Sequence, residues 1–305
     1  MSGADQVLAI GRRRTAIRPR RPFWHGRLHG SEFAWAVAFV VPYAGVFFAF
    51  AVYPIVYGFW MAARPSLYAE LISDPIYVLT VVNTVLFVGI GVNLKMFLAL
   101  LLSGFFMRRR WWIKAVSVIY ILPWALSAIP TFTSFHWMLI GPAGLLDSAL
   151  SVLFGIEGPI WFNNRWLALG CNIVSYVWKW MPFWTLIFLA ARMAIPREIY
   201  EAADIDGASG PRRFVHVTFP LLGNVYLICT LLSTIWALGD FATVNLVSGG
   251  APGMASEVLT SLSFRYAFDM LRPDLGVVVA MSALPVLIPI VVVLMRMMRT
   301  REVQL

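Results

Sequence analysis

Long apolar runs separated by short charged segments define the pattern of this chain. A helix of about 20 apolar residues, rising about 1.5 Å per residue, crosses the hydrocarbon core of a bilayer, which is about 30 Å thick. Six windows are long enough, and each contains at most one lysine or histidine. We therefore predict six membrane-spanning helices, within residues 33–63, 75–107, 115–146, 166–191, 214–239 and 275–295.

Residues 241–256 form a further uncharged stretch, but glycine and proline interrupt it at 248–253. Such clusters are typical of turns. We predict a loop here, with a re-entrant loop as the alternative form.

The composition supports a membrane protein. The chain has 305 residues, of which 60% are hydrophobic, 15% aromatic and 13% charged, whereas a soluble domain has about 25% charged residues. Its mean hydropathy is +0.77, and a compact soluble fold could not bury this much apolar surface. The net charge of +9 would be compatible with nucleic-acid binding, but the positions of the charges argue against it. The two cysteines, Cys171 and Cys229, lie far apart within apolar runs and indicate neither a disulfide framework nor a zinc site.

Basic residues gather on one side of the predicted membrane. Eighteen of the 24 Lys and Arg fall in the two tails and in the second-to-third and fourth-to-fifth connections, whereas four fall on the other side. Because basic loops are retained in the cytoplasm, both termini are predicted to be cytoplasmic. The predicted organisation is a basic tail at 1–32, a six-span domain at 33–298 with a cytoplasmic loop at about 192–220, and a short tail at 299–305. We interpret the basic tail as a topology determinant, with a lipid or nucleic-acid site as the alternative.

The cytoplasmic loop at 192–220 predicts two short helices around a sharp turn. Pro196 suits a first helical position, and the sequence then runs without a helix breaker to Asp206. Gly207 is expected to stop the helix in a left-handed conformation. A second helix is expected to begin at Ser209 or Gly210, with Pro211 in its first turn. This loop could lie on the bilayer surface or dock into another protein.

The same loop resembles the EAA loop of binding-protein-dependent ABC importer permeases. The likeness is carried by Glu201-Ala202-Ala203-Asp204-Ile205-Asp206-Gly207, followed by Phe219-Pro220-Leu221. Gly144-Leu145-Leu146-Asp147 and Pro159-Ile160-Trp161 resemble the outer loop of the maltose and glycerol-phosphate type first permease, although Asp147 replaces the usual Asn. The resemblance covers about residues 35–297.

This resemblance implies an all-α membrane protein with six transmembrane helices in the MetI-like type I ABC importer permease fold. It further implies a second homologous permease subunit, two ATP-binding subunits, an extracytoplasmic binding protein and a place in the bacterial cytoplasmic membrane. The chain itself is expected to be non-catalytic and without a cofactor, since it has no phosphate-binding loop and the partner subunits would bind ATP and Mg. Coupling to the ATPase is assigned by resemblance to Glu201, Ala202, Ala203, Asp206 and Gly207.

Two stripes of polar and aromatic residues inside the spans predict the substrate pathway, because polar side chains in a span usually face a cavity. One stripe is on the fourth span and the other on the fifth, and their members are Tyr176, Lys179, Trp180, Phe183, Ser233, Trp236 and Asp240. In the maltose-type permeases these two helices line the sugar site, and aromatic faces with hydroxyl-binding groups suit a sugar. The aromatic members could instead pack or anchor the helices. Lys179 could face the cavity, extend to the membrane interface or pair with Asp240.

The predicted function is therefore a permease for a sugar or sugar derivative, neutral or anionic. The main alternative is a permease of the same superfamily for an amino acid or another polar metabolite. An ion-coupled carrier is disfavoured because Asp240 is the only carboxylate that the spans offer, at a helix end. An embedded enzyme is disfavoured because His136 and His216 have no nearby carboxylate or thiol at a motif spacing.

Overall fold

A computed structural model describes residues 31–108 and 110–302 of the chain. Within these residues every regular element is a helix. The predicted basic tail at 1–32 and the last residues of the predicted C-terminal tail lie almost entirely outside them. The chain divides into two compact units, Met1–Tyr57 and Gly58–Leu305, and each is described by itself.

The first unit consists of α1 (Ser31–Phe47), the π-helical turn η2 (Phe48–Val52) and the start of α2 (Tyr53–Ala62). Large apolar side chains are exposed all around α1 and η2, for example Trp35, Phe39 and Phe50. A helix that is apolar on every side is stable in lipid or against another protein and not in water. The continuous helical stretch Ala34–Ala62 is long and apolar enough to cross a membrane.

The second unit begins with the short α3 (Pro65–Ser73) and the long α4 (Pro75–Phe106). The helices that follow are α5 (Trp111–Ala125), α6 (Ala128–Leu139), α7 (Leu145–Phe154), α8 (Arg165–Met193), α9 (Arg197–Ile205) and α10 (Gly210–Arg213). The rest of the unit comprises η3 (Phe214–Thr218), α11 (Phe219–Leu221), α12 (Gly223–Leu238), α13 (Ala242–Val247), α14 (Leu259–Phe264), η4 (Arg265–Asp269), α15 (Pro273–Met281) and α16 (Leu284–Glu302).

The helices reproduce the positions of the predicted spans, but two of these are bent. Four stretches of the described chain are long and apolar enough to cross a membrane: Ala34–Ala62, Pro75–Phe106, Arg165–Met193 and Pro273–Arg299. The other two windows are helix pairs, Trp111–Ala125 with Ala128–Leu139, bent by 96°, and Gly210–Leu221 with Gly223–Leu238, bent by 70°. Pro123 and Pro130 flank the first bend, and Pro220 precedes the second. Proline removes a backbone donor and clashes with the preceding turn, which accounts for breaks at these places.

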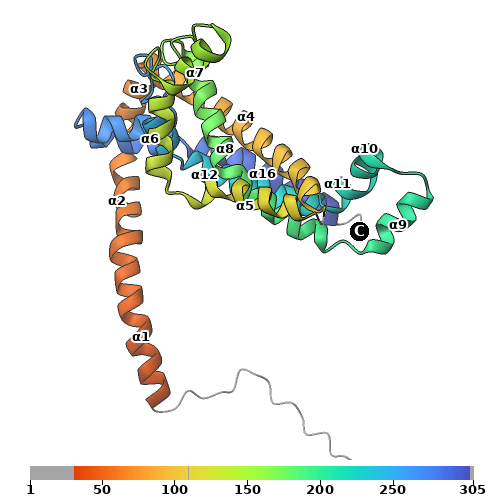
Figure 1. Ribbon diagram of the computed structural model, residues 1–305. Coiled ribbons are helices and arrows are strands. Elements are labelled where there is room, and N and C mark those ends of the chain that lie inside the picture. Colours follow the sequence, from red (N-terminus) through yellow and green to blue (C-terminus); the bar gives the residue numbers. More distant parts are fainter. Residues whose placement is uncertain (1–30, 109, 303–305) are drawn as a thin grey trace, which may run out of the picture. The chain divides into compact units, whose positions relative to one another are not determined.

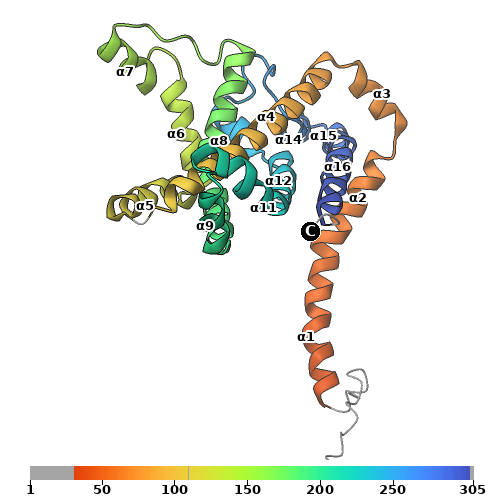
Figure 2. The ribbon, with the colours of Figure 1, turned by 90° about the vertical axis from the view of Figure 1, so that its right-hand side faces the viewer.

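The core of the second unit is the packing of α4 along α8, with α12 on α4 (Figures 1 and 2). Met96 and Leu100 of α4 and Trp184 and Phe188 of α8 are fully buried there. Because α7 precedes α8 in the chain and α9 follows it, these two elements lie at opposite ends of α8 (Figure 1). The predicted outer loop and the predicted coupling loop are thus about one helix length apart.

The uncharged stretch at 241–256 is a short helix followed by a folded loop. Residues 242–247 form α13, which corrects the prediction that the whole stretch is a loop. Gly249, Gly250 and Gly253 have positive φ, as the cluster of turn residues requires. A Cβ on Gly250 would come within 2.2 Å of Glu257 Oε1, so only glycine fits above this fully buried carboxylate. Arg265 neutralises Glu257 at 2.7 Å, and the loop is therefore held inside the protein.

Candidate functional site

A cavity of about 370 Å³ lies halfway along α8, between this helix, α4 and the start of α13. Its lining residues come from three segments that are far apart in the sequence: Lys95, Tyr176, Trp180, Trp184, Trp236, Gly239, Asp240, Phe241 and Ala242. Since α4 and α8 are both apolar helices of spanning length, the cavity is at mid-membrane depth.

Two opposite charges line this cavity. Lys95 is 1% exposed and donates a hydrogen bond to the Tyr176 hydroxyl at 2.7 Å. Asp240 follows α12, and its carboxylate accepts hydrogen bonds from the Thr243 backbone nitrogen at 3.0 Å and the Thr243 hydroxyl at 2.7 Å. These bonds hold the carboxylate at the start of α13, where the positive end of the helix dipole favours it. The formal charges of the two lining residues cancel.

Aromatic rings form most of the cavity wall. Trp184 and Trp236 pack with their centroids 5.5 Å apart, and the Lys95 nitrogen lies 5.8 Å from the centre of the Trp184 ring. Trp236 lines the cavity and remains 53% exposed. Aromatic faces beside a few fixed polar groups are the usual lining of a small-molecule site.

Of the seven residues predicted for the substrate pathway, four line the cavity: Tyr176, Trp180, Trp236 and Asp240. The other three are close to it in sequence but do not line it. Ser233 is fully buried on α12. Phe183 stacks on Trp124 of α5, with centroids 5.4 Å apart, and also contacts Trp236. The transport roles of all seven stay predictions.

Lys179 occupies a different environment from the one expected for a cavity residue. Its ammonium donates hydrogen bonds to the carbonyls of Pro123, at 2.6 Å, and Leu126. These carbonyls belong to the C-terminal end of α5, where the 96° bend leaves them without an intrahelical donor. Among the described residues Lys179 has no ion pair with Asp240. Lys179 therefore caps the broken helix.

Five lining residues were not predicted: Lys95, Trp184, Gly239, Phe241 and Ala242. Lys95 is the single charge in its window, so the rule that selected Lys179 also applied to it. Trp180 and Trp184 lie four and eight residues after Tyr176. These three residues form the stripe of α8 that faces the cavity. Phe241 has no periodic signal, because it lies where α12 ends and the chain turns.

The predicted coupling loop has the expected geometry. The loop helix α9 ends at Ile205, Gly207 has φ +74°, and α10 begins at Gly210 after Ser209. The Gly207 nitrogen donates to the Asp204 carbonyl at 3.1 Å and the Ala208 nitrogen to the Ala203 carbonyl at 2.8 Å, which is the Schellman arrangement. One detail differs: Pro196 precedes the helix as its N-cap and is not in its first turn.

Most of α9 is available to a partner. Glu201, Ala202, Asp206 and Gly207 are exposed, whereas Ala203 is buried. An open space surrounds the position where Gly207 would carry a Cβ, so the backbone conformation is what requires glycine there.

At the opposite end of α8, the residues of the predicted outer loop meet. Asp147 is buried and accepts a hydrogen bond from the Trp161 indole nitrogen at 2.8 Å. A Cβ on Gly158 would come within 2.0 Å of the Asp147 carboxylate. The described residues contain no group of three or more His, Cys, Asp or Glu side chains placed to hold a metal ion.

Comparison with known proteins defines the class. Residues 54–301 match the family described as binding-protein-dependent transport system inner membrane component, and the chain belongs to this family. It is therefore a transporter permease with several membrane-spanning helices.

Two relatives are similar over most of their length. The sulfoquinovosyl glycerol transport system permease protein of Agrobacterium fabrum is 31% identical over 77% of this chain and 76% of its own. The trehalose/maltose transport system permease protein of Thermococcus litoralis is 30% identical over 74% and 81%.

The fold is that of a solved importer. A chain of a bacterial ABC transporter involved in the import of the acidic polysaccharide alginate superposes with a TM-score of 0.76 at 20% identity, covering 88% of this chain and 96% of that one. The same type of transporter, in complex with a periplasmic protein that carries an alginate pentasaccharide, gives a TM-score of 0.75.

Proposed function

We propose that this chain is the permease subunit of an ATP-driven ABC importer for a sugar or sugar derivative. The observation that carries the proposal is the cavity at mid-depth, where aromatic rings and two polar groups are arranged to hold a ligand. Flat C–H faces of a sugar ring pack on aromatic rings, and hydroxyls pair with a carboxylate and an ammonium. The names of the two relatives support a carbohydrate.

An uncharged sugar or glycoside suits the cavity better than an anionic one. Lys95 and Asp240 both line it, and their charges compensate each other without a ligand charge. An anionic sugar would add a negative charge beside Asp240 at a depth where uncompensated charge is costly.

The proposed orientation places α9 in the cytoplasm. Six spans result when each bent helix pair crosses once, and both termini then lie on the side of α9, in agreement with the distribution of basic residues. Reporter fusions after Arg299 test the orientation. An extracytoplasmic reporter signal there would contradict it and the placement of the coupling loop.

The proposed partners follow from the class of importer. They are a second homologous permease, two ATPase subunits at the α9 loop and an extracytoplasmic binding protein that delivers the sugar. ATP and Mg would be bound by the ATPase subunits, and this chain would be non-catalytic, in the bacterial cytoplasmic membrane. Closure of the ATPase dimer would move α9 as a rigid lever, because its C-terminal end is fixed by the Gly207 turn.

Gly207 provides a test of this coupling. The variant Gly207→Val forces a β-branched residue into left-handed space, at a cost of about 1–2 kcal/mol, and should abolish transport-linked ATP hydrolysis while substrate delivery by the binding protein is retained. Gly207→Asn tolerates the left-handed conformation and is the matched control. Equal uptake by the two variants would contradict the lever.

Substrate class is tested by uptake into proteoliposomes that contain the complete importer, with a panel of sugars and amino acids supplied on the binding-protein side. We expect ATP-dependent uptake of a sugar. Uptake of an amino acid with no sugar transported would favour the alternative permease of the same superfamily.

A further inference from the structure

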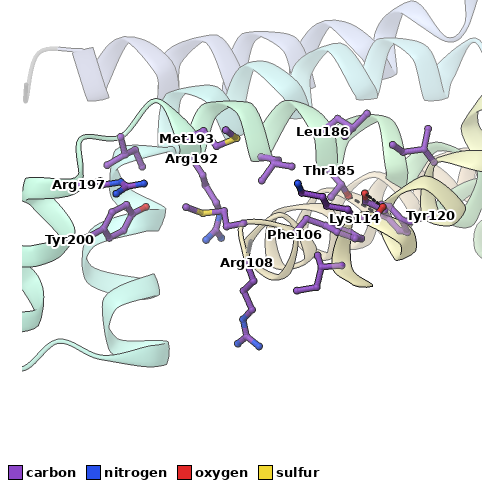
Figure 3. A pocket seen from close by; sticks show the side chains of 16 residues that line it. Phe106, Arg108, Lys114, Tyr120, Thr185, Leu186, Arg192, Met193, Arg197 and Tyr200 are labelled. Carbon is purple, nitrogen blue, oxygen red and sulfur yellow. Dashed lines mark hydrogen bonds between the residues drawn. The ribbon is translucent and has the colours of Figure 1, made fainter. Parts of the chain in front are cut away.

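A second cavity, of about 350 Å³, lies at the α9 end of the unit (Figure 3). The end of α4, the first three turns of α5, the last turns of α8 and the start of α9 surround it. Its inner wall is apolar and includes Ile121 and Leu189. The cavity shares no lining residue with the cavity at mid-depth.

Four basic residues line this cavity: Arg108, Lys114, Arg192 and Arg197. No carboxylate or histidine is among its lining residues. Within residues 31–108 and 110–302, none of the four makes an ion pair with a carboxylate, whereas the neighbouring Arg213 is neutralised by Asp204 at 2.7 Å. The four positive charges therefore have no counter-charge from the described part of the chain.

Arg192 is the most informative of the four because it is only 7% exposed. Its Nη2 donates to the Leu100 carbonyl at 2.9 Å, but its buried Nε has no hydrogen-bond partner. The buried hydroxyl of Tyr200, which also borders the cavity, has none either. Figure 3 shows Arg192 between Lys114 on one side and Arg197 with Tyr200 on the other. Buried polar groups without partners are uncommon, and a ligand that accepts hydrogen bonds would satisfy both.

The surroundings favour a ligand that is apolar at one end. The cavity is at the end of the spanning helices α4 and α8. Trp111, at the start of α5, is 82% exposed, and tryptophans concentrate at membrane–water interfaces. An acyl chain could follow Ile121 and Leu189, while a phosphate reaches the basic residues.

We propose that this cavity binds an anionic phospholipid, with its phosphate among Arg108, Lys114, Arg192 and Arg197. In the orientation given under Proposed function the lipid belongs to the cytoplasmic leaflet, and this is the only point that rests on that function. Anionic lipids concentrate in that leaflet and attract basic clusters near the membrane surface. The lipid would link α5 to α9, because both contribute basic residues to the site.

The test uses the complete importer, purified in detergent and titrated with phosphatidylglycerol or phosphatidylcholine, with bound lipid counted by native mass spectrometry. The double variant Arg108→Gln, Lys114→Gln removes two exposed charges, which spares the packing of the protein. The matched control is Arg299→Gln, an exposed basic residue near the end of α16. We expect the double variant to bind phosphatidylglycerol about thirtyfold more weakly than the wild type, and the control to be unchanged.

Further measurements separate the possible occupants. Retention of phosphatidylglycerol in the presence of excess inorganic phosphate supports a lipid, whereas displacement by phosphate would show a small-anion site and overturn the proposal. Equal binding of the two lipids, or equal phosphatidylglycerol binding by the double variant and the control, would also overturn it. Loss of the ATPase subunits from the double variant, with the lipid retained, would also overturn the proposal. The basic residues would then bind a protein subunit and not a lipid. None of these measurements uses sugar uptake. The lipid-binding results would therefore stay the same if the chain transported something other than a sugar.

Discussion

Two buried lysines lie on different faces of α8: Lys95, from α4, lies against the cavity face, and Lys179, from α8 itself, lies on the face toward α5. On the cavity face, Lys95 of α4 contacts Tyr176 and shares the cavity with Asp240. On the face toward α5, Lys179 binds the carbonyls of Pro123 and Leu126 at the helix break. Both side chains are 1% exposed, so burial alone does not distinguish them. The two lysines differ in what surrounds the ammonium group. Lys95 lines an open cavity, whereas Lys179 is bonded to backbone carbonyls.

From this difference we infer that Lys95 has a role in transport, whereas Lys179 has a structural role. A charge in a span is costly and must be compensated. Lys179 obtains this compensation from the chain itself, whereas Lys95 lies where a ligand can take part. We therefore expect substitutions on the two faces to act on different measurable quantities, stability on one and uptake on the other.

The largest effect is expected for Lys179→Met. Loss of the ammonium leaves two carbonyls at the end of α5 without a donor, at about 1–3 kcal/mol each. Thermal unfolding of the purified complex should shift to lower temperature, and the yield of assembled importer should fall. Lys179→Arg keeps donors at this place and is the control. A Lys179→Met complex of normal stability that fails to take up substrate would instead place Lys179 on the substrate pathway, as the sequence predicts.

Lys95→Met should give the next largest effect. It removes the hydrogen bond to Tyr176 and leaves Asp240 as the only charge of the cavity. Hydrogen bonds to charged groups contribute about 1.5–3 kcal/mol, so we expect uptake at limiting substrate to fall by about thirtyfold, with a normal basal ATPase rate. Normal uptake by this variant would contradict the distinction between the two faces.

Trp180→Ala should have a smaller effect on uptake. It removes one aromatic wall, and aromatic contacts contribute about 0.5–1.5 kcal/mol, which predicts a loss of up to about tenfold. Trp178→Ala is the matched control, since Trp178 lies on the same helix and packs on Phe135 outside the cavity. Equal loss in both variants would mean that the effect comes from the helix and not from the cavity.

The sequence predicted the positions of the helices better than it predicted which of their residues face the cavity. Each of the six apolar windows coincides with a helix of spanning length or with a bent helix pair, because the length and hydropathy of a window can be read directly from the sequence. They did not show the bends at Leu126 and Leu222, which depend on where proline and π-helical turns fall. The backbone structure of the loop at 192–220 was predicted almost residue by residue, because glycine and proline determine local backbone conformation by themselves, whereas its coupling role stays a prediction.

The cavity was predicted only in part, for a geometric reason. Helical spacing identifies residues that share a face. Because spacings of three and of four residues both keep residues on one face, spacing alone does not separate two neighbouring stripes. The stripe through Lys179 and Phe183 therefore seemed to continue the one through Tyr176 and Trp180. The packing of α5 against α8 separates them, and no pattern within α8 contains that information. Lys95 could have been selected by the rule that selected Lys179, since it is the single charge in its window, but its contact with Tyr176, 81 residues away, could not be predicted.

A structure of the assembled importer, trapped with its sugar during transport, tests the central claim most directly. We expect sugar density in the cavity at mid-depth, packed on Trp180 and Trp236 and within hydrogen-bond distance of Lys95 or Asp240. The Lys179 ammonium should remain on the Pro123 and Leu126 carbonyls in the same structure. Sugar density that contacts Lys179 and leaves the cavity of Lys95 and Asp240 empty would contradict the assignment of this cavity as the sugar site.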